Sequence, residues 1–162
     1  MRAVVSVRPA QISDAADLAR LTHQLGYEMA ASDAATRLTR VLARPEHMVL
    51  IAEAGGATVG WLHASLSLHL DTDTCVLIEG IVVDREHRRQ GIGELLLARA
   101  EAWGLDQGCS TVRLRSTSTR LKAHKFYEKL GYTTVKTQLS FAKGLDAAGR
   151  EVVKRLVPRV QE

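Results

Sequence analysis

The residues whose types and spacing best suit ligand binding lie in one segment, residues 81–94. An apolar strand runs into a basic loop, and the loop ends at Gly91 and Gly93, where a helical pattern begins. The first N–H groups of a helix have no partner within the helix, and glycines allow an anion to approach the backbone closely. Arg88 and Arg89 add charge-assisted donors beside those amides. The segment therefore predicts a binding site for a pyrophosphate group.

Two common phosphate-binding patterns fit this loop poorly. A P-loop continues from its last glycine into Lys and then Ser or Thr, whereas Gly93 is followed by Glu94-Leu95. A dinucleotide-binding turn needs a third glycine where Leu96 stands. An ordinary solvated basic turn is the remaining alternative. The strand, the arginines, the glycines and the amphipathic helix together favour the anion site.

Glu79 is the first candidate catalytic residue. It lies within the apolar stretch of residues 75–83, where a carboxylate is costly unless it is paired or reaches an opening. The adjacent Gly80 predicts a bulge that would re-aim a side chain and part the strands. At such an opening Glu79 could take a proton from an incoming ammonium group. The alternative is a structural ion pair with Arg113 or Arg115 of the next strand.

Tyr127 is the second candidate, as a proton donor. A phenol titrates at about pH 10, so at neutral pH it can protonate a leaving thiolate. Tyr127 lies on the apolar stripe of an expected helix, and a half-buried core tyrosine is therefore the alternative. His63, His69 and His124 are alternative bases. No set of His, Asp or Glu residues has convincing ligand spacing, so no metal is expected.

Hydrophobic spacing and turn residues predict the elements that position these groups. Strands are expected over residues 4–7, 48–52, 58–68, 75–83, 112–114 and 132–141. Helices are expected from Ser13 to Gly26, from Ser32 or Asp33 to Pro45, from Gly91 to Gly108, and over residues 123–130 and 151–157. The strand–helix–strand unit predicts a parallel crossover, and the hairpins before it predict antiparallel pairing. The expected fold class is α/β (α+β), a mixed, mostly antiparallel sheet with helices on both faces.

Length and composition fit a single globular domain. Of the 162 residues, 46% are hydrophobic and 25% are charged, so we expect one domain over residues 1–162, with 144–162 as a C-terminal extension. No apolar run could span a membrane, and residues 1–5 are expected to begin a strand rather than a targeting signal. Cys75 and Cys109 lack metal-ligand spacing and are expected to be reduced thiols. The expected location is cytoplasmic.

The charge of the chain is mildly basic, with a formal net charge of +4 and a pI of about 9.3. Nucleic-acid binding would predict a basic stripe with stacking aromatics, and only 4% of the residues are aromatic. Binding of an anionic cofactor explains the basic cluster at residues 85–89 more simply. A small nucleic-acid-binding protein is a third-ranked hypothesis, based on the cluster at residues 113–129, and no nucleic-acid partner is expected.

Three stretches resemble motifs of one protein family. The Arg/Gln-x-x-Gly-x-Gly/Ala loop of the GNAT superfamily, the acetyl-CoA-dependent N-acyltransferases, is similar to Arg88-Arg89-Gln90-Gly91-Ile92-Gly93. Residues 79–84 resemble the cofactor strand of that family, and residues 123–132 resemble its Ala-His-x-Phe-Tyr-x-x-x-Gly-Tyr/Phe motif. The resemblance covers residues 4–143 by order of elements as well as by motif. Each motif alone is moderately specific, but their shared order points strongly to one cofactor class.

The resemblance implies that acetyl-CoA is the cosubstrate and gives each motif a role. The main chain of Ile81, Val82 and Val83 would pair with the pantetheine arm. The pyrophosphate would be held by backbone N–H groups, assisted by Arg88 and Arg89; these N–H groups belong to Gln90, Gly91, Ile92, Gly93 and Glu94. Phe126 and Lys129 would contact the CoA arm. Tyr127 would lie near the thioester sulfur, and Glu79 stands where members often carry a basic carboxylate.

The leading hypothesis is an N-acetyltransferase that acts on a primary amine of a small molecule or of a peptide, by direct attack in a ternary complex. A non-catalytic acyl-CoA-binding sensor is the alternative, because it would share the fold and the cofactor site. The acceptor is expected to contact Tyr27, Glu28, Trp61 and His63. Many members of the family are dimers, so a homodimer is the default expectation.

Overall fold

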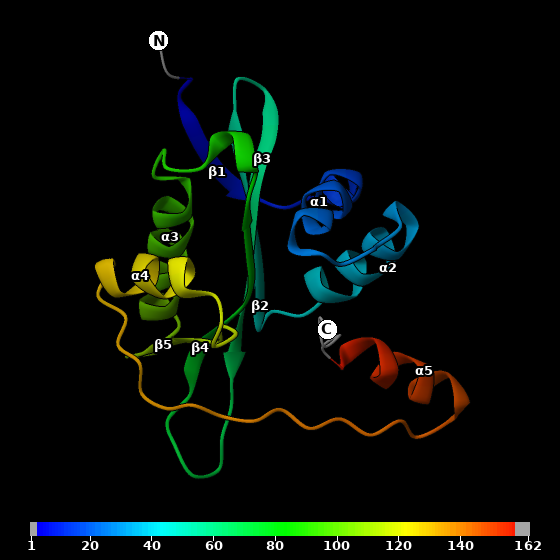
Figure 1. Cartoon of the computed structure of the whole chain (residues 1–162). Coiled ribbons are helices and arrows are strands. Elements are labelled where there is room, and N and C mark those ends of the chain that lie inside the picture. Colours follow the sequence, from blue (N-terminus) through cyan, green and yellow to red (C-terminus); the bar gives the residue numbers. More distant parts are fainter. Residues whose placement is uncertain (1–2, 158–162) are drawn as a thin grey trace. The chain divides into compact units, whose positions relative to one another are not determined.

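A computed structural model describes residues 3–157 of the chain, which form two compact units that divide after Thr117 (Figure 1). Residues 1–2 of the expected first strand and residues 158–162 of the expected C-terminal extension lie outside the described part. None of the helices in the described part is both long enough and apolar enough to cross a membrane.

The first unit is built around a five-stranded sheet with the order β1-β2-β3-β4-β5. Its strands are β1 Val5–Pro9, β2 His47–Ala54, β3 Ala57–Ser67, β4 Cys75–Val83 and β5 Val112–Leu114. The first four strands pair antiparallel with their neighbours, and β5 pairs parallel with β4. The predicted mixed, mostly antiparallel sheet is confirmed. Gly55 and Gly56 form the turn that joins β2 to β3, with φ angles of 58° and 80° that suit glycine.

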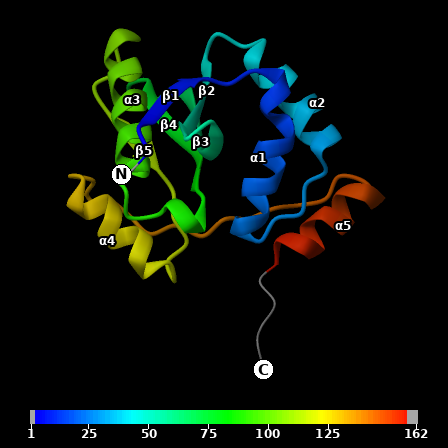
Figure 2. The same cartoon turned by 90° about the horizontal axis from the view of Figure 1, so that it is seen from above.

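Helices cover both faces of this sheet, as predicted (Figures 1 and 2). One face is covered by α1 Ala15–Thr22 and α2 Ala31–Leu42, and the other by α3 Ile92–Asp106. Short 3-10 turns flank them at η1 Ile12–Asp14, η2 His23–Leu25 and η3 Arg85–His87. Gly26 ends η2 in the left-handed conformation, as expected for a stop residue.

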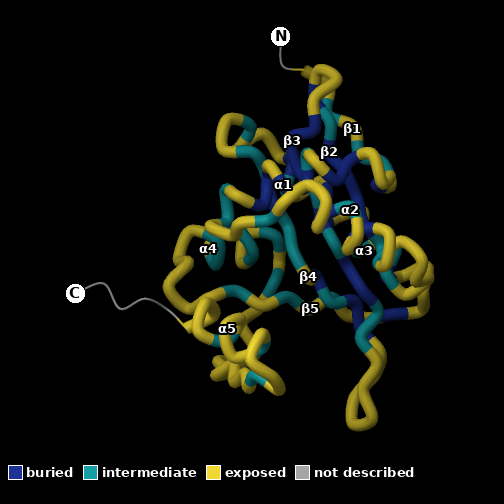
Figure 3. Tube along the Cα trace, turned by 90° about the vertical axis from the view of Figure 1, so that its right-hand side faces the viewer, coloured by how far each residue is buried: buried dark blue, intermediate teal, exposed yellow. Residues whose placement is uncertain are grey.

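The core of the first unit lies along β2 and β3, which are the most continuously buried strands (Figure 3). Ile51 and Leu62 are fully buried there, and Leu21 and Leu96 pack from the helical layers. Gly60 of β3 has no room for a side chain, because an added Cβ would lie 2.9 Å from the carbonyl oxygen of Val82 on β4. The side chains of Ile92 and Leu96 of α3 would lie 3.5 Å from the same position.

The second unit contains α4 Leu121–Lys129 and α5 Ala147–Leu156. Helix α4 ends as the sequence predicts, at Gly131, whose φ is 92°. The N–H of Gly131 donates to the carbonyl of Glu128, and the N–H of Tyr132 donates to the carbonyl of Tyr127, both at 3.0 Å. These two bonds form a Schellman motif, which satisfies the last carbonyls of the helix.

The expected strand over residues 132–141 is wrong, because the structure gives this segment neither strand nor helix. Its apolar residues are irregularly spaced, and Val135, Leu139 and Phe141 are all strongly exposed. Without a buried face, nothing fixes the register of a strand.

Three helix starts also differ from the predictions. Ser13 does not cap the first helix; instead, the side chain of Asp14 accepts a hydrogen bond from the N–H of Gln11. Helix α2 begins at Ala31, ahead of the predicted Ser32 or Asp33. Helix α5 begins four residues early because Asp146 caps it, accepting from the N–H of Gly149 at 2.7 Å.

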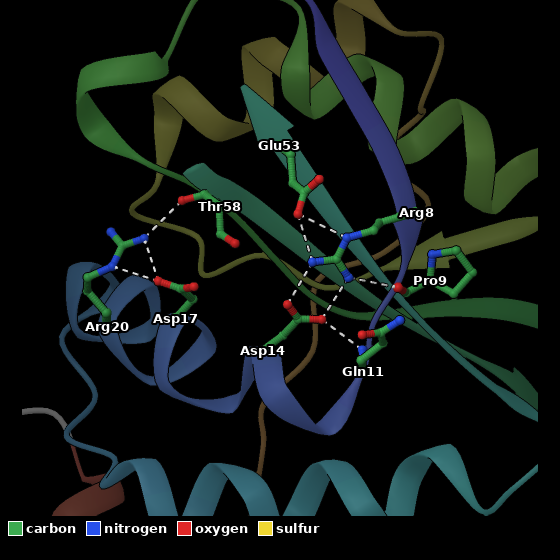
Figure 4. A network of polar contacts seen from close by, with 8 residues as sticks. All are labelled: Arg8, Pro9, Gln11, Asp14, Asp17, Arg20, Glu53 and Thr58. Carbon is green, nitrogen blue, oxygen red and sulfur yellow. Dashed lines mark hydrogen bonds and ion pairs between the residues drawn. The ribbon is translucent and has the colours of Figure 1, made fainter. Parts of the chain in front are cut away.

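A charged network centred on Arg8 joins β1, β2 and the start of the helical layer (Figure 4). The Arg8 guanidinium donates to both oxygens of Asp14, at 2.7 and 2.8 Å, and to Glu53 at 2.8 and 3.0 Å. Hydrogen bonds from Arg8 hold the pKa of Asp14 below its ordinary value, despite the opposing effect of burial. Because this pKa is lowered on folding, the network stabilises the fold above the pKa of an unfolded Asp and loses that effect as the pH falls.

We expect Asp14→Asn to lower the free energy of unfolding by about 1–3 kcal/mol at pH 7, because the buried partner of Arg8 loses its charge. The difference from the wild type should shrink as the pH falls through the lowered pKa of Asp14. Urea unfolding at several pH values measures both effects. Asp17→Asn is the control, because the Asp17 side chain is only partly buried and pairs with Arg20, apart from the Arg8 network. Equal stability of Asp14→Asn and Asp17→Asn would contradict this account.

Candidate active site

Strand β4 has an open edge over its second half. Pairing with β5 joins Val76, Leu77 and Ile78 to Val112, Arg113 and Leu114 and goes no further. Residues 80–83 of β4 pair only with β3 among the strands of the described chain. The predicted cofactor strand, Ile81-Val82-Val83, lies on this stretch. Its outward main-chain groups can therefore receive an extended ligand as an additional strand.

A bulge lies where the open edge begins. The β3–β4 register shifts between His63, opposite Gly80, and Ala64, opposite Ile78, so that Glu79 has no partner residue. The bulge predicted from Gly80 is confirmed. Glu79 is exposed, as a bulge that re-aims its side chain allows.

The carboxylate of Glu79 accepts a hydrogen bond of 2.7 Å from the hydroxyl of Ser65 on β3. Ser65 is buried, so the donor is fixed while the acceptor reaches solvent. In the described part of the chain, Glu79 forms no ion pair with Arg113 or Arg115, contrary to the structural alternative. The arrangement holds the Glu79 carboxylate by one buried donor and leaves it accessible to solvent.

Two histidines lie beside this carboxylate on the same face of the sheet. His47 Nδ1 and His63 Nε2 are 2.9 Å apart, and the two rings stack at 5.1 Å. Burial and the neighbouring His47 lower the pKa of His63, although Glu79 opposes this effect. His63 is therefore a neutral imidazole at neutral pH, and one ring donates to the other. Sequence reasoning identified His63 but missed its partner His47.

Trp61 and His63, two of the predicted acceptor-binding residues, line a cavity of about 240 Å³ between the α1–α2 layer and the sheet. Trp61 lies over Gly80, where an added Cβ would be 2.8 Å from its ring atom Cη2. The other two predicted residues, Tyr27 and Glu28, lie between η2 and α2 and are not part of the cavity wall. Tyr27 is exposed. Of the four residues predicted to bind the acceptor, the structure therefore places two, Trp61 and His63, in the wall of one cavity.

The predicted pyrophosphate loop has the backbone of an anion-binding turn. Arg89 and Gly91 adopt left-handed conformations, with φ angles of 60° and 78°. Gly91 is the N-cap of α3, and the fully buried Ile92 fixes the first turn of that helix against the sheet. The first N–H groups of α3 lack partners within the helix. Left-handed residues next to a helix start direct consecutive N–H groups toward one point.

One side chain of this loop bonds the end of β4, and the side chains that follow it reach solvent. Arg88 Nε donates to the carbonyl of Val83 at 3.3 Å, which joins the loop to the end of β4. Arg89 and Gln90 are exposed. Gly93 and Glu94 lie in the first turn of α3, as predicted.

Helix α1 and the η2 turn anchor the loop from outside it, a connection that sequence reasoning missed. Gln24 accepts a hydrogen bond of 2.9 Å from the N–H of Arg85 and donates to Asp84 at 3.4 Å. Arg20 donates to Asp84 at 3.4 Å and to the carbonyl of Thr58 at 2.9 Å (Figure 4 shows the Thr58 contact). No local pattern reveals these contacts, since their partners are 38 to 64 residues apart.

The remaining predicted site residues lie on α4 in the second unit. Tyr127 is half-buried and contacts two aromatic rings, Phe126 at 5.3 Å and Tyr132 at 6.0 Å. Burial raises the pKa of Tyr127 above its ordinary value, against a smaller lowering by Arg120. The phenol therefore keeps its proton at neutral pH. Lys129 is exposed near the end of the same helix.

Comparison with known proteins decides the family. Residues 13–132 match the acetyltransferase (GNAT) family. An aminoglycoside N(6')-acetyltransferase type 1 from Stenotrophomonas maltophilia is 30% identical over 146 residues, which cover 87% of this chain and 94% of that protein. The chain belongs to the GNAT acetyltransferase family. The predicted acetyltransferase activity and the predicted cosubstrate, acetyl-CoA, are thereby confirmed for this GNAT enzyme.

Two further comparisons agree with this assignment. A thialysine N-epsilon-acetyltransferase from Bos taurus is 29% identical over 143 residues, which cover 80% of this chain and 84% of that protein. The crystallised aminoglycoside N-acetyltransferase AAC(6')-Iy, in complex with CoA, shares the fold with a TM-score of 0.78 at 21% identity. The match covers 87% of this chain and 95% of that structure.

We expect Gly80→Ala to destabilise the enzyme by about 1–3 kcal/mol, because the added methyl group would overlap the Trp61 ring. Urea unfolding, followed by far-ultraviolet circular dichroism, measures the loss. Trp61→Leu in the same chain should recover part of it, because the smaller side chain leaves room for the methyl group. Additive effects of the two substitutions would contradict the proposed contact.

Proposed function

We propose that this enzyme transfers an acetyl group from acetyl-CoA to a primary amine by direct attack in a ternary complex. The observation that carries the proposal is the position of Glu79, held by Ser65 at the bulge where the open edge of β4 begins. A thioester bound along that edge would lie next to Glu79, the proposed base.

The proposed cofactor site combines the open edge with the loop that follows it. The main chain of residues 81–83 pairs with the pantetheine arm, and the amides of residues 90–94 hold the pyrophosphate. Arg89 adds positive charge to the loop, whereas Arg88 both supports the loop through Val83 and contributes charge. Phe126 and Lys129 contact the CoA arm from α4, a role that rests on the family resemblance.

The proposed reaction requires three proton transfers. Glu79, directly or through a water molecule, accepts a proton from the ammonium group, and the free amine attacks the thioester carbonyl carbon. A backbone N–H of residues 81–83 stabilises the oxyanion. When the carbon–sulfur bond breaks, the thiolate of CoA takes a proton from Tyr127. The Tyr127 phenolate regains a proton from the attacking nitrogen, which carries one proton too many after the attack and becomes the neutral amide. The raised pKa of Tyr127 keeps that proton available at neutral pH.

The relatives suggest two classes of acceptor. One group of relatives is named for aminoglycosides and another for thialysine. The proposed acetyl transfer to a primary amine agrees with either class of acceptor. The larger group of these matches is named for aminoglycosides. The alternative of a non-catalytic acyl-CoA sensor is less favoured, because a sensor has no need for a carboxylate held at the open edge. The homodimer expected from the sequence stays a prediction.

We expect Glu79→Gln to lower kcat by about 10²–10⁴-fold, because the amide cannot accept the proton of the ammonium group. The KM for acetyl-CoA should change little. Release of free thiol from acetyl-CoA, with a panel of aminoglycosides, thialysine and simple amines, measures both constants. Glu46→Gln, an exposed change before β2, is the matched control. Wild-type enzyme that binds acetyl-CoA but acetylates no amine, or an unaffected kcat in Glu79→Gln, would overturn the proposal.

A further inference from the structure

The cavity between the α1–α2 layer and the sheet is small, and most of its wall is apolar. Its volume of about 240 Å³ lies below the range of roughly 300–1,000 Å³ that is usual for sites of drug-sized ligands. The apolar part of the wall comes from both helices, from the segment between them and from β2, and consists of Leu18, Met29, Ala34, Leu38, Val41 and Val49. Such a wall favours a small ligand with an apolar body.

The charge of the wall excludes one kind of amine. Arg37 is the only residue of the wall with a permanent charge, and the wall contains no Asp or Glu. A polycationic acceptor would lose hydration there, would find no carboxylate, and would be repelled by Arg37. The cavity therefore does not suit an aminoglycoside, the acceptor for which several relatives are named.

One accessible donor of the wall has no acceptor in the described part of the chain. The Arg37 guanidinium contacts the sulfur of Met29 at 3.4 Å and forms no ion pair there, and Arg37 is exposed, so its charge is accessible to a ligand. The indole N–H of Trp61 also has no hydrogen-bond partner in that part, but it is closed to solvent and therefore not open to a ligand in the cavity. The hydroxyl of Thr22 is already bonded to the carbonyl of Leu18 at 2.6 Å. A ligand that supplies anionic oxygen atoms would pair with Arg37.

The position of Glu79, the proposed base, determines which end of the cavity the amine group of a ligand would occupy. His63 ends the wall on β3 and lies opposite Gly80, next to the bulge that carries Glu79. An amine group at the His63 end would thus reach the proposed base, while the rest of the molecule occupies the cavity.

We propose that the acceptor is a small primary amine with an apolar body and one carboxylate, an amino-acid-like molecule whose carboxylate pairs with Arg37. The inference rests on the proposed acetyl transfer and adds the substrate class. Arg37 thereby acts as a specificity-determining residue.

The test compares carboxylates with their matched amides as acceptors. Leucine, phenylalanine and 6-aminohexanoate are each paired with the corresponding carboxamide, and kanamycin represents the polycations. For at least one pair we expect kcat/KM at least tenfold higher for the carboxylate, and also higher than for kanamycin. Arg37→Met keeps an apolar stem but removes the charge, so it should abolish the preference, mainly through KM, and leave the amides unaffected. Arg40→Met, on the same helix but outside the wall, should behave like the wild type.

The outcomes separate this inference from the proposed function. Turnover of amines without any preference for a carboxylate, or a higher kcat/KM for kanamycin, would overturn the substrate class while acetyl transfer stands. If no amine is acetylated, binding of the carboxylates is measured by tryptophan fluorescence in Trp103→Phe protein, which reports on Trp61 alone. Binding that Arg37→Met weakens at least tenfold would support the carboxylate site even then. Absence of such binding would overturn it.

Discussion

The structure depends on how far β5 pairs with β4. Three residue pairs hold the two strands together, and the pairing ends at Ile78 and Leu114. Beyond that point the backbone of β4 is supported only by β3 within its sheet, so one edge stays available for an extended ligand. A longer β5 would close this edge and remove the proposed thioester site. The bulge between β3 and β4 lies at the same point, so the re-aimed, exposed carboxylate of Glu79 stands where the open edge begins.

The supports of the site come from elements far apart in the sequence. Gln24 and Arg20 hold the loop that precedes Gly91, and α1, which carries Arg20, also forms part of the wall of the cavity through Leu18 and Thr22. The proposed cofactor loop and the proposed acceptor cavity therefore share a rigid element. Polar contacts of this kind position reactive groups without taking part in the reaction.

The parts of the site set by local patterns could be predicted from the sequence. The bounds of β4 match the prediction to the residue, and the glycine turn at Gly91 follows from residue type. The roles of His47 and Ser65 depend on cross-strand register, which local patterns do not show. The strand expected over residues 132–141 failed because its apolar residues have no common buried face.

The central claim is that main-chain amides from Gln90 to Glu94 bind the pyrophosphate of CoA. Isothermal titration calorimetry with CoA and with pantetheine tests this claim most directly. We predict that free CoA binds with measurable heat and that pantetheine, which lacks the diphosphate, binds at least tenfold more weakly. No heat with millimolar CoA, or equal affinity for the two compounds, would contradict the account.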